Sequence, residues 1–197
     1  MTLTHSKKND LGLAIPDFSL PATDGNDYSI SSFSDNKVLV IIFTCNHCPY
    51  AKFAKPKIVG LFEKTKSQDV QFIAINSNDA DNYPEDSFEN MKKDEYNYPF
   101  PYLHDVSQNI AKQFGAVCTP DIFVYDQERK LAYHGQLDDS RPGLGAVAIN
   151  TMFNKKINNS NSTAIDLENA IEALLADQVP EKNQKPSIGC SIKWKEW

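Results

Sequence analysis

Apolar runs separated by polar, turn-forming stretches divide this chain into alternating strands and helices. Val38–Phe43 and residues 70–75 are continuously apolar and rich in β-branched side chains, as expected for strands covered on both faces. Residues 50–66 lie between them and have a helical composition, with Pro56 expected to kink the helix or to mark its local start. This strand–helix–strand unit predicts an α/β protein.

The rest of the chain continues the alternation. We expect an extended entry at residues 14–20, followed by a turn at Asp24-Gly25. After the second apolar strand we expect a helix from Pro84 to about residue 96, a short strand at 102–104, and a helix capped by Ser107 and ended by Gly115. The last part should contain an antiparallel hairpin of 121–126 with 131–135, a surface loop at 154–162, and a helix with a capping box of Thr163 and Asp166. This order predicts a mixed central β-sheet with helices on both faces.

The length of 197 residues fits one domain, residues 1–197, with residues 180–197 as a C-terminal tail that Trp194 and Trp197 would anchor by burial. The formal net charge of −6 argues against nucleic-acid or anionic-membrane partners, which require a basic face. The one candidate basic patch is formed by Lys52, Lys55 and Lys57, and we interpret it as a solvated helix face.

The compartment is predicted from the first residues and from the cysteine content. Residues 1–10 are polar and do not resemble a secretory signal peptide, and Val38–Phe43 is too short to cross a bilayer. We therefore expect a cytoplasmic protein. In a reducing compartment, four cysteines of which two are closely spaced indicate catalysis or metal binding rather than structural disulfides.

The candidate chemistry lies at Cys45-Asn46-His47-Cys48, between a predicted strand and a predicted helix. Two cysteines three positions apart at a helix start can form a disulfide, and the free amides of the first turn stabilise a thiolate. This context predicts Cys45 as the exposed attacking thiol and Cys48 as the resolving thiol. His47 lies between them, where its N–H or cationic form would favour the thiolate further.

Zinc is the competing interpretation, because such a pair supplies half of a tetrahedral site. The other ligands would have to come from Cys118 and Cys190 or from the histidines, and no second pair with this spacing exists. We therefore expect a redox pair, no metal and no organic cofactor. Cys118 and Cys190 are either packed as small apolar residues or act as additional redox thiols.

The second informative site is Thr119-Pro120, just before a predicted strand. Proline is allowed at the first residue of a strand, and a cis bond there is uncommon in general. From these residues alone, the trans isomer is expected.

Together, these motifs resemble the peroxiredoxin-like proteins that carry a thioredoxin-type motif, in the alkyl hydroperoxide reductase/thiol-specific antioxidant (redoxin) branch of the thioredoxin fold. The resemblance runs over residues 12–195 and rests on Pro16-Asp17-Phe18, Cys45-Asn46-His47-Cys48-Pro49-Tyr50, Cys118-Thr119-Pro120-Asp121, Asp138-Asp139-Ser140-Arg141-Pro142 and Gly189-Cys190-Ser191-Ile192-Lys193-Trp194-Lys195. It implies a thioredoxin-like fold with an N-terminal extension. It also implies a cis Thr119-Pro120 bond against the cysteine pair, with the Thr119 backbone free to pair with a substrate strand.

The expected function is thiol-disulfide exchange, with protein or small-molecule thiols and disulfides as substrates and a thiol reductant system. A thiol-dependent peroxidase acting on peroxide is the first alternative. True peroxiredoxins carry Thr or Ser three positions and Pro seven positions before the reactive cysteine, whereas this chain has Cys45 and Ile41 before Cys48. A distant arginine, Arg129 or Arg141, could still complete such a site. A non-catalytic metal-binding or interaction protein on the same fold is the other alternative.

Overall fold

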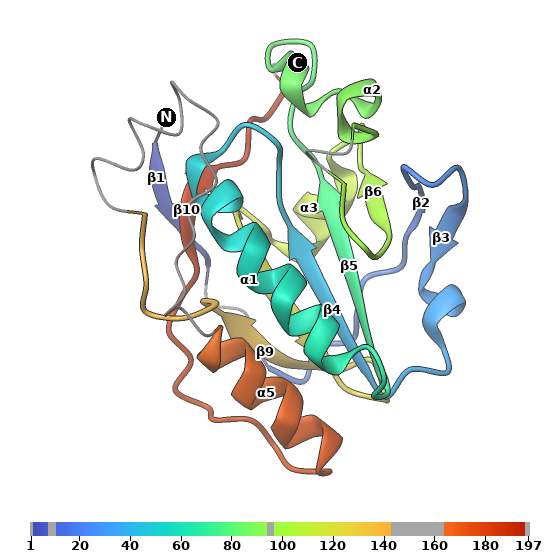
Figure 1. Ribbon diagram of the computed structural model, residues 1–197, viewed down its shortest axis with the longest axis vertical. Helices are drawn as coiled ribbons and strands as arrows, with labels where there is room; N and C mark the ends of the chain where they lie inside the picture. Colours follow the sequence, from blue (N-terminus) through green and yellow to red (C-terminus); the bar gives the residue numbers. More distant parts are fainter. Residues whose placement is uncertain (1, 8–10, 94–96, 143–163, 196–197) are drawn as a thin grey trace.

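A mixed five-stranded sheet forms the centre of the protein, whose computed structural model describes residues 2–7, 11–93, 97–142 and 164–195 (Figure 1). In spatial order the strands are β6 (Tyr102–His104), β5 (Val70–Asn76), β4 (Val38–Phe43), β8 (Asp121–Tyr125) and β9 (Leu131–Gly135). Strands β5 and β6 run parallel to β4, whereas β8 is antiparallel to both β4 and β9. The predicted mixed sheet is confirmed.

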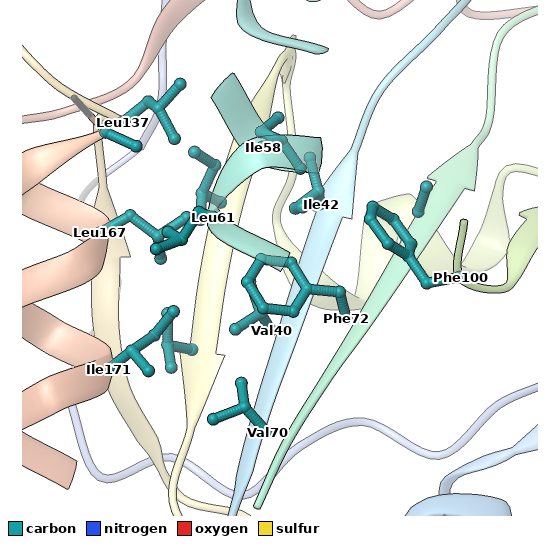
Figure 2. Packing of buried hydrophobic residues seen from close by; sticks show 14 of the residues in the cluster. Val40, Ile42, Ile58, Leu61, Val70, Phe72, Phe100, Leu137, Leu167 and Ile171 are labelled. Carbon is teal, nitrogen blue, oxygen red and sulfur yellow. The ribbon is translucent and has the colours of Figure 1, made fainter. Parts of the chain in front are cut away.

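Helices cover both faces of this sheet, as predicted. Side chains alternate along a strand, so Val40 and Ile42 of β4 face one layer while Leu39 and Ile41 face the other. The first layer holds α1 (Pro49–Thr65) and α5 (Ile165–Leu175), and α3 (Asn109–Phe114) packs in the second. Figure 2 shows Ile58, Leu61, Leu167 and Ile171 from α1 and α5 packing over the strands of the first layer.

Two smaller β-structures flank the central sheet. Strands β2 (Ser19–Pro21) and β3 (Asp27–Ser29) form a hairpin around the predicted Asp24-Gly25 turn, followed by the 3₁₀ turn η1 (Ile30–Phe33). Gly25 has φ of 91°, a left-handed conformation that glycine adopts without steric cost.

The other small sheet brings both ends of the chain together. Strand β10 (Ile188–Ser191) pairs antiparallel with β1 (Leu3–His5) on one side and with β7 (Cys118–Thr119) on the other. The tail is therefore held by strand pairing rather than by tryptophan burial. Trp194 is 37% exposed, which makes the expected anchoring by its side chain wrong, and Trp197 lies outside the described residues.

The helix predicted from Pro84 is interrupted after one turn. The structure has a 3₁₀ turn, η2 (Pro84–Asp86), and a short helix, α2 (Phe88–Met91), separated by Ser87 in an extended conformation. Ser87 caps α2 by accepting a hydrogen bond from the Asn90 amide at 3.3 Å. The break leaves the side chain of Asp86 free to turn into the interior.

Other local predictions also need correction. Helix α1 is continuous through Pro56, so this proline is not a helix start. The side chain of Lys57 is 5% exposed and lies 3.0 Å from a carboxylate oxygen of Asp138, so it is not part of a solvated face. The N-cap of α3 is Gln108 rather than Ser107, and α5 begins after Ala164. Thr163 and the loop at 154–162 lie outside the described residues.

Within the part of the chain that the structure describes, no helix is both long and apolar enough to cross a membrane.

Candidate functional site

The Cys45–Cys48 segment connects the end of β4 to the start of α1. Cys48 is the N-cap residue of α1, and Pro49 occupies the first helical position, for which its fixed φ and missing amide hydrogen are suited. The unpaired amides of the first turn therefore lie near Cys48, whereas Cys45 lies before the helix. Cys45 is 5% exposed and Cys48 is 0% exposed. The prediction of an exposed Cys45 is wrong.

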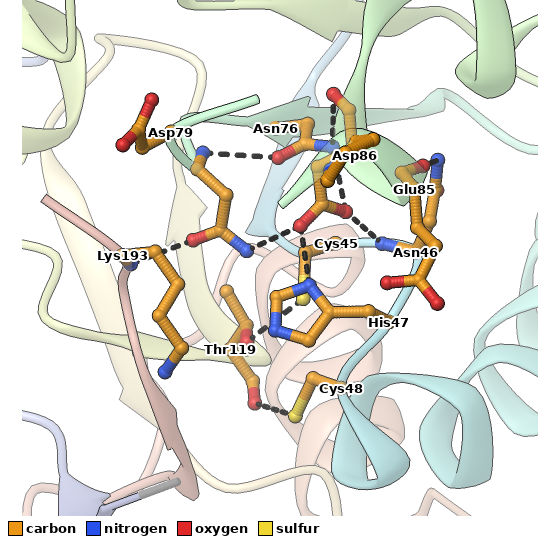
Figure 3. A network of polar contacts seen from close by, with 12 residues as sticks. Cys45, Asn46, His47, Cys48, Asn76, Asp79, Glu85, Asp86, Thr119 and Lys193 are labelled. Carbon is orange, nitrogen blue, oxygen red and sulfur yellow. Dashed lines mark hydrogen bonds and ion pairs between the residues drawn. The ribbon is translucent and has the colours of Figure 1, made fainter. Parts of the chain in front are cut away.

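The loop between β7 and β8 lies against both thiols. The Thr119-Pro120 bond is cis, as the resemblance implied, and the trans isomer expected from the residues alone is wrong. The Thr119 hydroxyl lies 3.3 Å from Cys45 Sγ, and the Cys48 thiol donates to the Thr119 carbonyl at 3.3 Å. One residue of this loop thus contacts both cysteines (Figure 3).

His47 is held beside Cys45 by a carboxylate. Its Nδ1 lies 2.5 Å from Oδ2 of Asp86 (Figure 3). Its ring stacks on Tyr83 with the centroids 5.0 Å apart. Cys45 Sγ, a ring nitrogen of His47 and a carboxylate oxygen of Asp86 all lie within 4.8 Å of one another. Nε2 of His47 is buried without a hydrogen-bond partner. The sequence predicted the histidine beside the thiols but not its partner.

Asp86, the last residue of η2, is the centre of this buried polar network. Its Oδ1 accepts a hydrogen bond from the Asn46 backbone amide at 2.6 Å, and its Oδ2 accepts one from Asn78 Nδ2 at 2.9 Å. Asn76 Nδ2 donates to Oδ1 at 3.3 Å. Burial opposes ionisation, but the bonds from His47 and the amides outweigh it and lower the pKa of Asp86. Asp86 is therefore a buried carboxylate that fixes the backbone between the two cysteines.

The C-terminal strand brings a third cysteine to the pair. Cys190 of β10 is the pairing partner of Thr119, and its side chain packs with Cys45, Cys48 and Ala51. We refer to Cys45, Cys48 and Cys190 as the thiol cluster. The Cys48 side chain is hydrogen-bonded to the side chains of both Cys45 and Cys190, so it occupies the central position.

The chain beyond β10 is fastened to the loops at the same edge of the sheet. Asn78 Oδ1 accepts a hydrogen bond from the Lys193 amide at 2.8 Å, and the Asp79 amide donates to the Lys193 carbonyl at 2.9 Å. Gln108 Nε2 donates to the same carbonyl at 2.7 Å, while its Oε1 accepts from the Lys195 amide at 2.8 Å. These bonds hold the tail over the site.

The pKa values of the three thiols in the cluster are shifted in different directions. Burial raises the pKa of Cys45, and the bond to Cys48 together with burial raises the pKa of Cys190. Burial acts in the same direction on Cys48, but hydrogen bonds from Cys190, Cys45 and the Ala51 amide outweigh it and lower the pKa of Cys48. The Thr119 carbonyl acts the other way, because it accepts a bond only from the protonated thiol. The net effect favours the thiolate on Cys48 rather than on Cys45.

This arrangement predicts an unusual pH profile for alkylation. Because a lowered pKa keeps the Cys48 thiolate present in mildly acidic solution, its reaction rate with iodoacetamide should change little from about pH 8.5 down to pH 6, whereas an ordinary thiol slows about a hundredfold. Mass spectrometry of the Cys48 peptide gives the rate, with glutathione as the reference thiol. A rate that falls in parallel with that of glutathione would place the thiolate elsewhere.

The remaining cysteine and histidines lie outside the thiol cluster. The Cys118 thiol lies 3.7 Å from the Pro120 carbonyl, and burial raises the pKa of Cys118. Its role as an additional redox thiol stays a prediction. His134 Nε2 lies 2.8 Å from Oδ1 of the buried Asp121, and His104 stacks on an aromatic ring. Both histidines are thus packed within the fold rather than beside the cysteine pair.

The two arginines of the chain are hydrogen-bonded to oxygen atoms of other residues. Arg129 donates to the Asn36 carbonyl at 2.8 Å, and Arg141 donates to the Asp138 carbonyl at 2.7 Å and to Gln136 Oε1 at 2.6 Å. Both guanidinium groups are thus engaged in hydrogen bonds to other oxygen atoms of the chain.

Among the described residues, Cys45, His47 and Asp86 form a group that can offer three ligands to a metal ion. A tetrahedral zinc site needs a fourth ligand. A metal here would also have to replace the His47–Asp86 hydrogen bond, while both Asp86 oxygens already accept bonds from amide groups. Measuring the metal content of the purified protein tests the zinc alternative directly.

Sequence reasoning missed Asp86, Asn78 and Lys193 as parts of this site. One signal was present in the sequence. The polar run that begins with Asn76, the last residue of β5, leaves the sheet at the same end as Cys45, which comes after the parallel neighbour β4. Because the carboxyl ends of parallel strands meet at one edge of a sheet, this run belongs beside the cysteines.

Comparison with a solved structure covers the whole chain. An uncharacterized conserved protein from Geobacillus kaustophilus is 43% identical, with a TM-score of 0.88, and the match covers 100% of this chain and 98% of that one. Solved thioredoxin-like structures at 15% and 20% identity share the fold alone, with TM-scores of 0.54 and 0.61. The predicted thioredoxin-like fold is confirmed.

Curated relatives match parts of the chain. Chloroplastic peroxiredoxin Q from Oryza sativa subsp. japonica is 29% identical over 104 residues, which are 53% of this chain and 45% of that protein. Thiol-disulfide oxidoreductase ResA from Bacillus thuringiensis subsp. konkukian is 24% identical over 128 residues, or 65% of this chain and 70% of that protein. The match thus spans less than half the length of the peroxiredoxin Q relative.

The family comparison agrees with both relatives. The sequence model of the AhpC/TSA family matches residues 11–134, more than half of the chain. The matched region contains the Cys45–Cys48 segment, Asp86 and the cis Thr119-Pro120 loop. The chain therefore belongs to the AhpC/TSA family.

Proposed function

We propose that this protein is a thiol-disulfide oxidoreductase that works by dithiol-disulfide exchange at Cys45 and Cys48. Its substrates are protein or small-molecule thiols and disulfides, and a thiol reductant supplies the electrons. The observation that carries the proposal is a pair of hydrogen-bonded thiols at a helix N-terminus, in contact with Thr119 of the cis-proline loop. The similarity to ResA supports the same reaction class.

The exchange proceeds in two steps. The Cys48 thiolate attacks one sulfur of the substrate disulfide, so that a mixed disulfide forms, the substrate S–S bond breaks, and the leaving thiolate takes up a proton. Cys45 then attacks the Cys48 sulfur, which forms the Cys45–Cys48 disulfide and releases the second substrate thiol. The pair loses two electrons and the substrate gains them. The thiol reductant returns the pair to the dithiol by the reverse chemistry.

His47 and Asp86 serve the second step as positioning and proton-accepting groups. Asp86 accepts a hydrogen bond from Nδ1 of His47, so Nε2 is the ring nitrogen that has no partner. Cys45 has a raised pKa and must lose its proton before it attacks. The adjacent imidazole is a suitable acceptor for that proton.

Reduction of insulin disulfides by dithiothreitol tests the proposal. The protein should accelerate insulin reduction, and equimolar hydrogen peroxide should oxidise it slowly to a Cys45–Cys48 disulfide that mass mapping identifies. No acceleration of insulin reduction, together with rapid formation of a sulfenic acid on one cysteine, would replace this function with a peroxidase.

That peroxidase is the second candidate, and the lowered pKa of Cys48 favours it. Against it, Cys45 and Ile41 occupy the positions at which peroxiredoxins place their activating groups, and both arginines are bound elsewhere. A non-catalytic metal protein would instead purify with stoichiometric zinc and show neither activity.

A further inference from the structure

The C-terminal strand β10 carries Cys190 to the edge of the site. We propose that Cys190 is the third redox thiol of this centre, presented to Cys48 by β10 in the manner of a bound substrate segment. Oxidation then links Cys48 to Cys190 and fastens the tail over the cysteine pair. The inference rests on the proposed exchange function and adds a reaction partner contained within the chain.

Backbone pairing fixes the position of Cys190. Cys190 is paired with Thr119 and Ser191 with Cys118, and the Ile192 amide donates to the Val117 carbonyl at 2.9 Å. On its other side β10 is paired with β1, where Leu3 lies opposite Cys190. A strand held on both edges presents its side chains in one orientation, and this orientation places the Cys190 side chain in contact with Cys48.

Strand β10 also covers Cys45 and Cys48 and keeps external molecules from reaching them. Cys48 is fully buried, and Cys45 and Cys190 are each 5% exposed. An extended substrate that pairs with the Thr119 backbone would use the edge that β10 now occupies. Substrate and tail therefore compete for one position, and the tail must leave before an external disulfide reaches Cys48.

Gly189 is the residue that permits this close approach. A Cβ atom at this position would lie 2.0 Å from the Thr119 carbonyl oxygen and 2.5 Å from its carbon. Any other side chain must push β10 away from the cis-proline loop, because backbone atoms cannot yield as a flexible side chain does. The tail thus has a glycine where contact with the site requires one.

The chemistry balances without a further reactant. In a second route to the Cys45–Cys48 disulfide, β10 returns to the Thr119 edge after Cys48 has attacked the substrate disulfide. The Cys190 sulfur then attacks Cys48 in the mixed disulfide and loses its proton to the departing substrate thiolate. The Cys48–Cys190 bond forms, the bond from Cys48 to the substrate breaks, and two thiols have been oxidised for one disulfide reduced. Cys45 can then displace Cys190 from Cys48, which transfers the disulfide to the Cys45–Cys48 pair and releases the tail.

A single-turnover experiment with 5,5′-dithiobis(2-nitrobenzoate) tests this step in a Cys45→Ser variant. We expect release of a second equivalent of the coloured thiolate and a Cys48–Cys190 crosslinked peptide in the mass map. In the matched Cys45→Ser/Cys190→Ser variant, we expect the reaction at Cys48 to stop at the mixed disulfide. A stable mixed disulfide on Cys48 beside a free Cys190 would overturn the inference and leave the proposed function standing. No reaction at Cys48 would overturn the proposed function itself.

Gly189→Ala tests the position of the strand independently. This substitution should raise the rate at which iodoacetamide modifies Cys48 by roughly tenfold or more, because overpacking displaces β10. Gly60→Ala is the control, since a Cβ at Gly60 in α1 meets no atom within 4 Å. Equal rates in both variants would mean that β10 does not limit access to Cys48.

Discussion

A Cys48→Ser variant should lose catalysed disulfide reduction by on the order of 10³-fold or more, because a serine hydroxyl does not ionise near neutral pH and cannot replace the attacking thiolate. Cys48 is the central thiol of the cluster, so its loss removes both disulfides proposed above, Cys45–Cys48 and Cys48–Cys190. The insulin assay measures the effect, with circular dichroism to verify that the buried substitution leaves the fold intact.

The matched variant is Cys45→Ser, which removes the resolving thiol and keeps the attacking one. It should still become covalently linked to a substrate disulfide through Cys48, whereas Cys48→Ser should form no such adduct at the site. If the adduct instead forms on Cys45 in the Cys48→Ser variant and not on Cys48 in the other, the roles follow the sequence-based assignment, and the helix N-terminus does not decide which thiol attacks.

The second large effect concerns stability. Asp86→Ala should lower the free energy of unfolding by about 2–4 kcal/mol, because it leaves the Asn46 amide, Asn78 and His47 buried without their acceptor. Urea denaturation at neutral pH measures the change. The exposed neighbour Glu85 supplies the control, and Glu85→Ala should shift stability by no more than about 0.5 kcal/mol. Similar losses of unfolding free energy in both variants would mean that the change in the loop, rather than the loss of the buried carboxylate, destabilises the protein.

The stability contributed by Asp86 should also depend on pH. The pKa of this carboxyl is lower in the folded protein than in the unfolded chain, so its ionised form stabilises the fold above the unfolded value, and the contribution disappears as pH falls through the folded value. The difference between wild type and Asp86→Ala should therefore be full at neutral pH and shrink below about pH 4. Urea titrations at pH 7 and near pH 3 compare the two, and an unchanged difference would show that Asp86 contributes only by packing.

The parts of the site that could be predicted from the sequence are those fixed by local pattern. The apolar strand β4, the cysteine pair and a following helix are contiguous, so their order alone places the thiols at the start of α1. The residue at which α1 begins could not be predicted from the sequence. It puts Cys48 rather than Cys45 at the N-cap, where hydrogen bonds lower the pKa of Cys48.

The predictions that were wrong concern features that depend on contacts between distant segments. The helix from Pro84 follows local propensity, whereas the observed break at Ser87 turns Asp86 toward the Asn46 amide. The strand at Ile188–Ser191 has no alternating pattern, and it exists because β1 and β7 supply pairing edges on both sides. The isomer of Thr119-Pro120 is likewise set by the folded surroundings, so the residues alone favoured the wrong one.

The strand that carries Cys190 and the strand paired with it on the side away from Thr119 lie outside the region matched by the family. Residues 11–134 contain the reacting pair, its carboxylate and the proline loop, whereas β1 and β10 lie before and after that range. The Cys45–Cys48 pair and the strand that covers it are thus encoded in separate stretches of the polypeptide. We therefore expect relatives that share the matched region and differ at their ends to admit different substrates. Such a change alters the two termini and leaves Cys45 and Cys48 where they are.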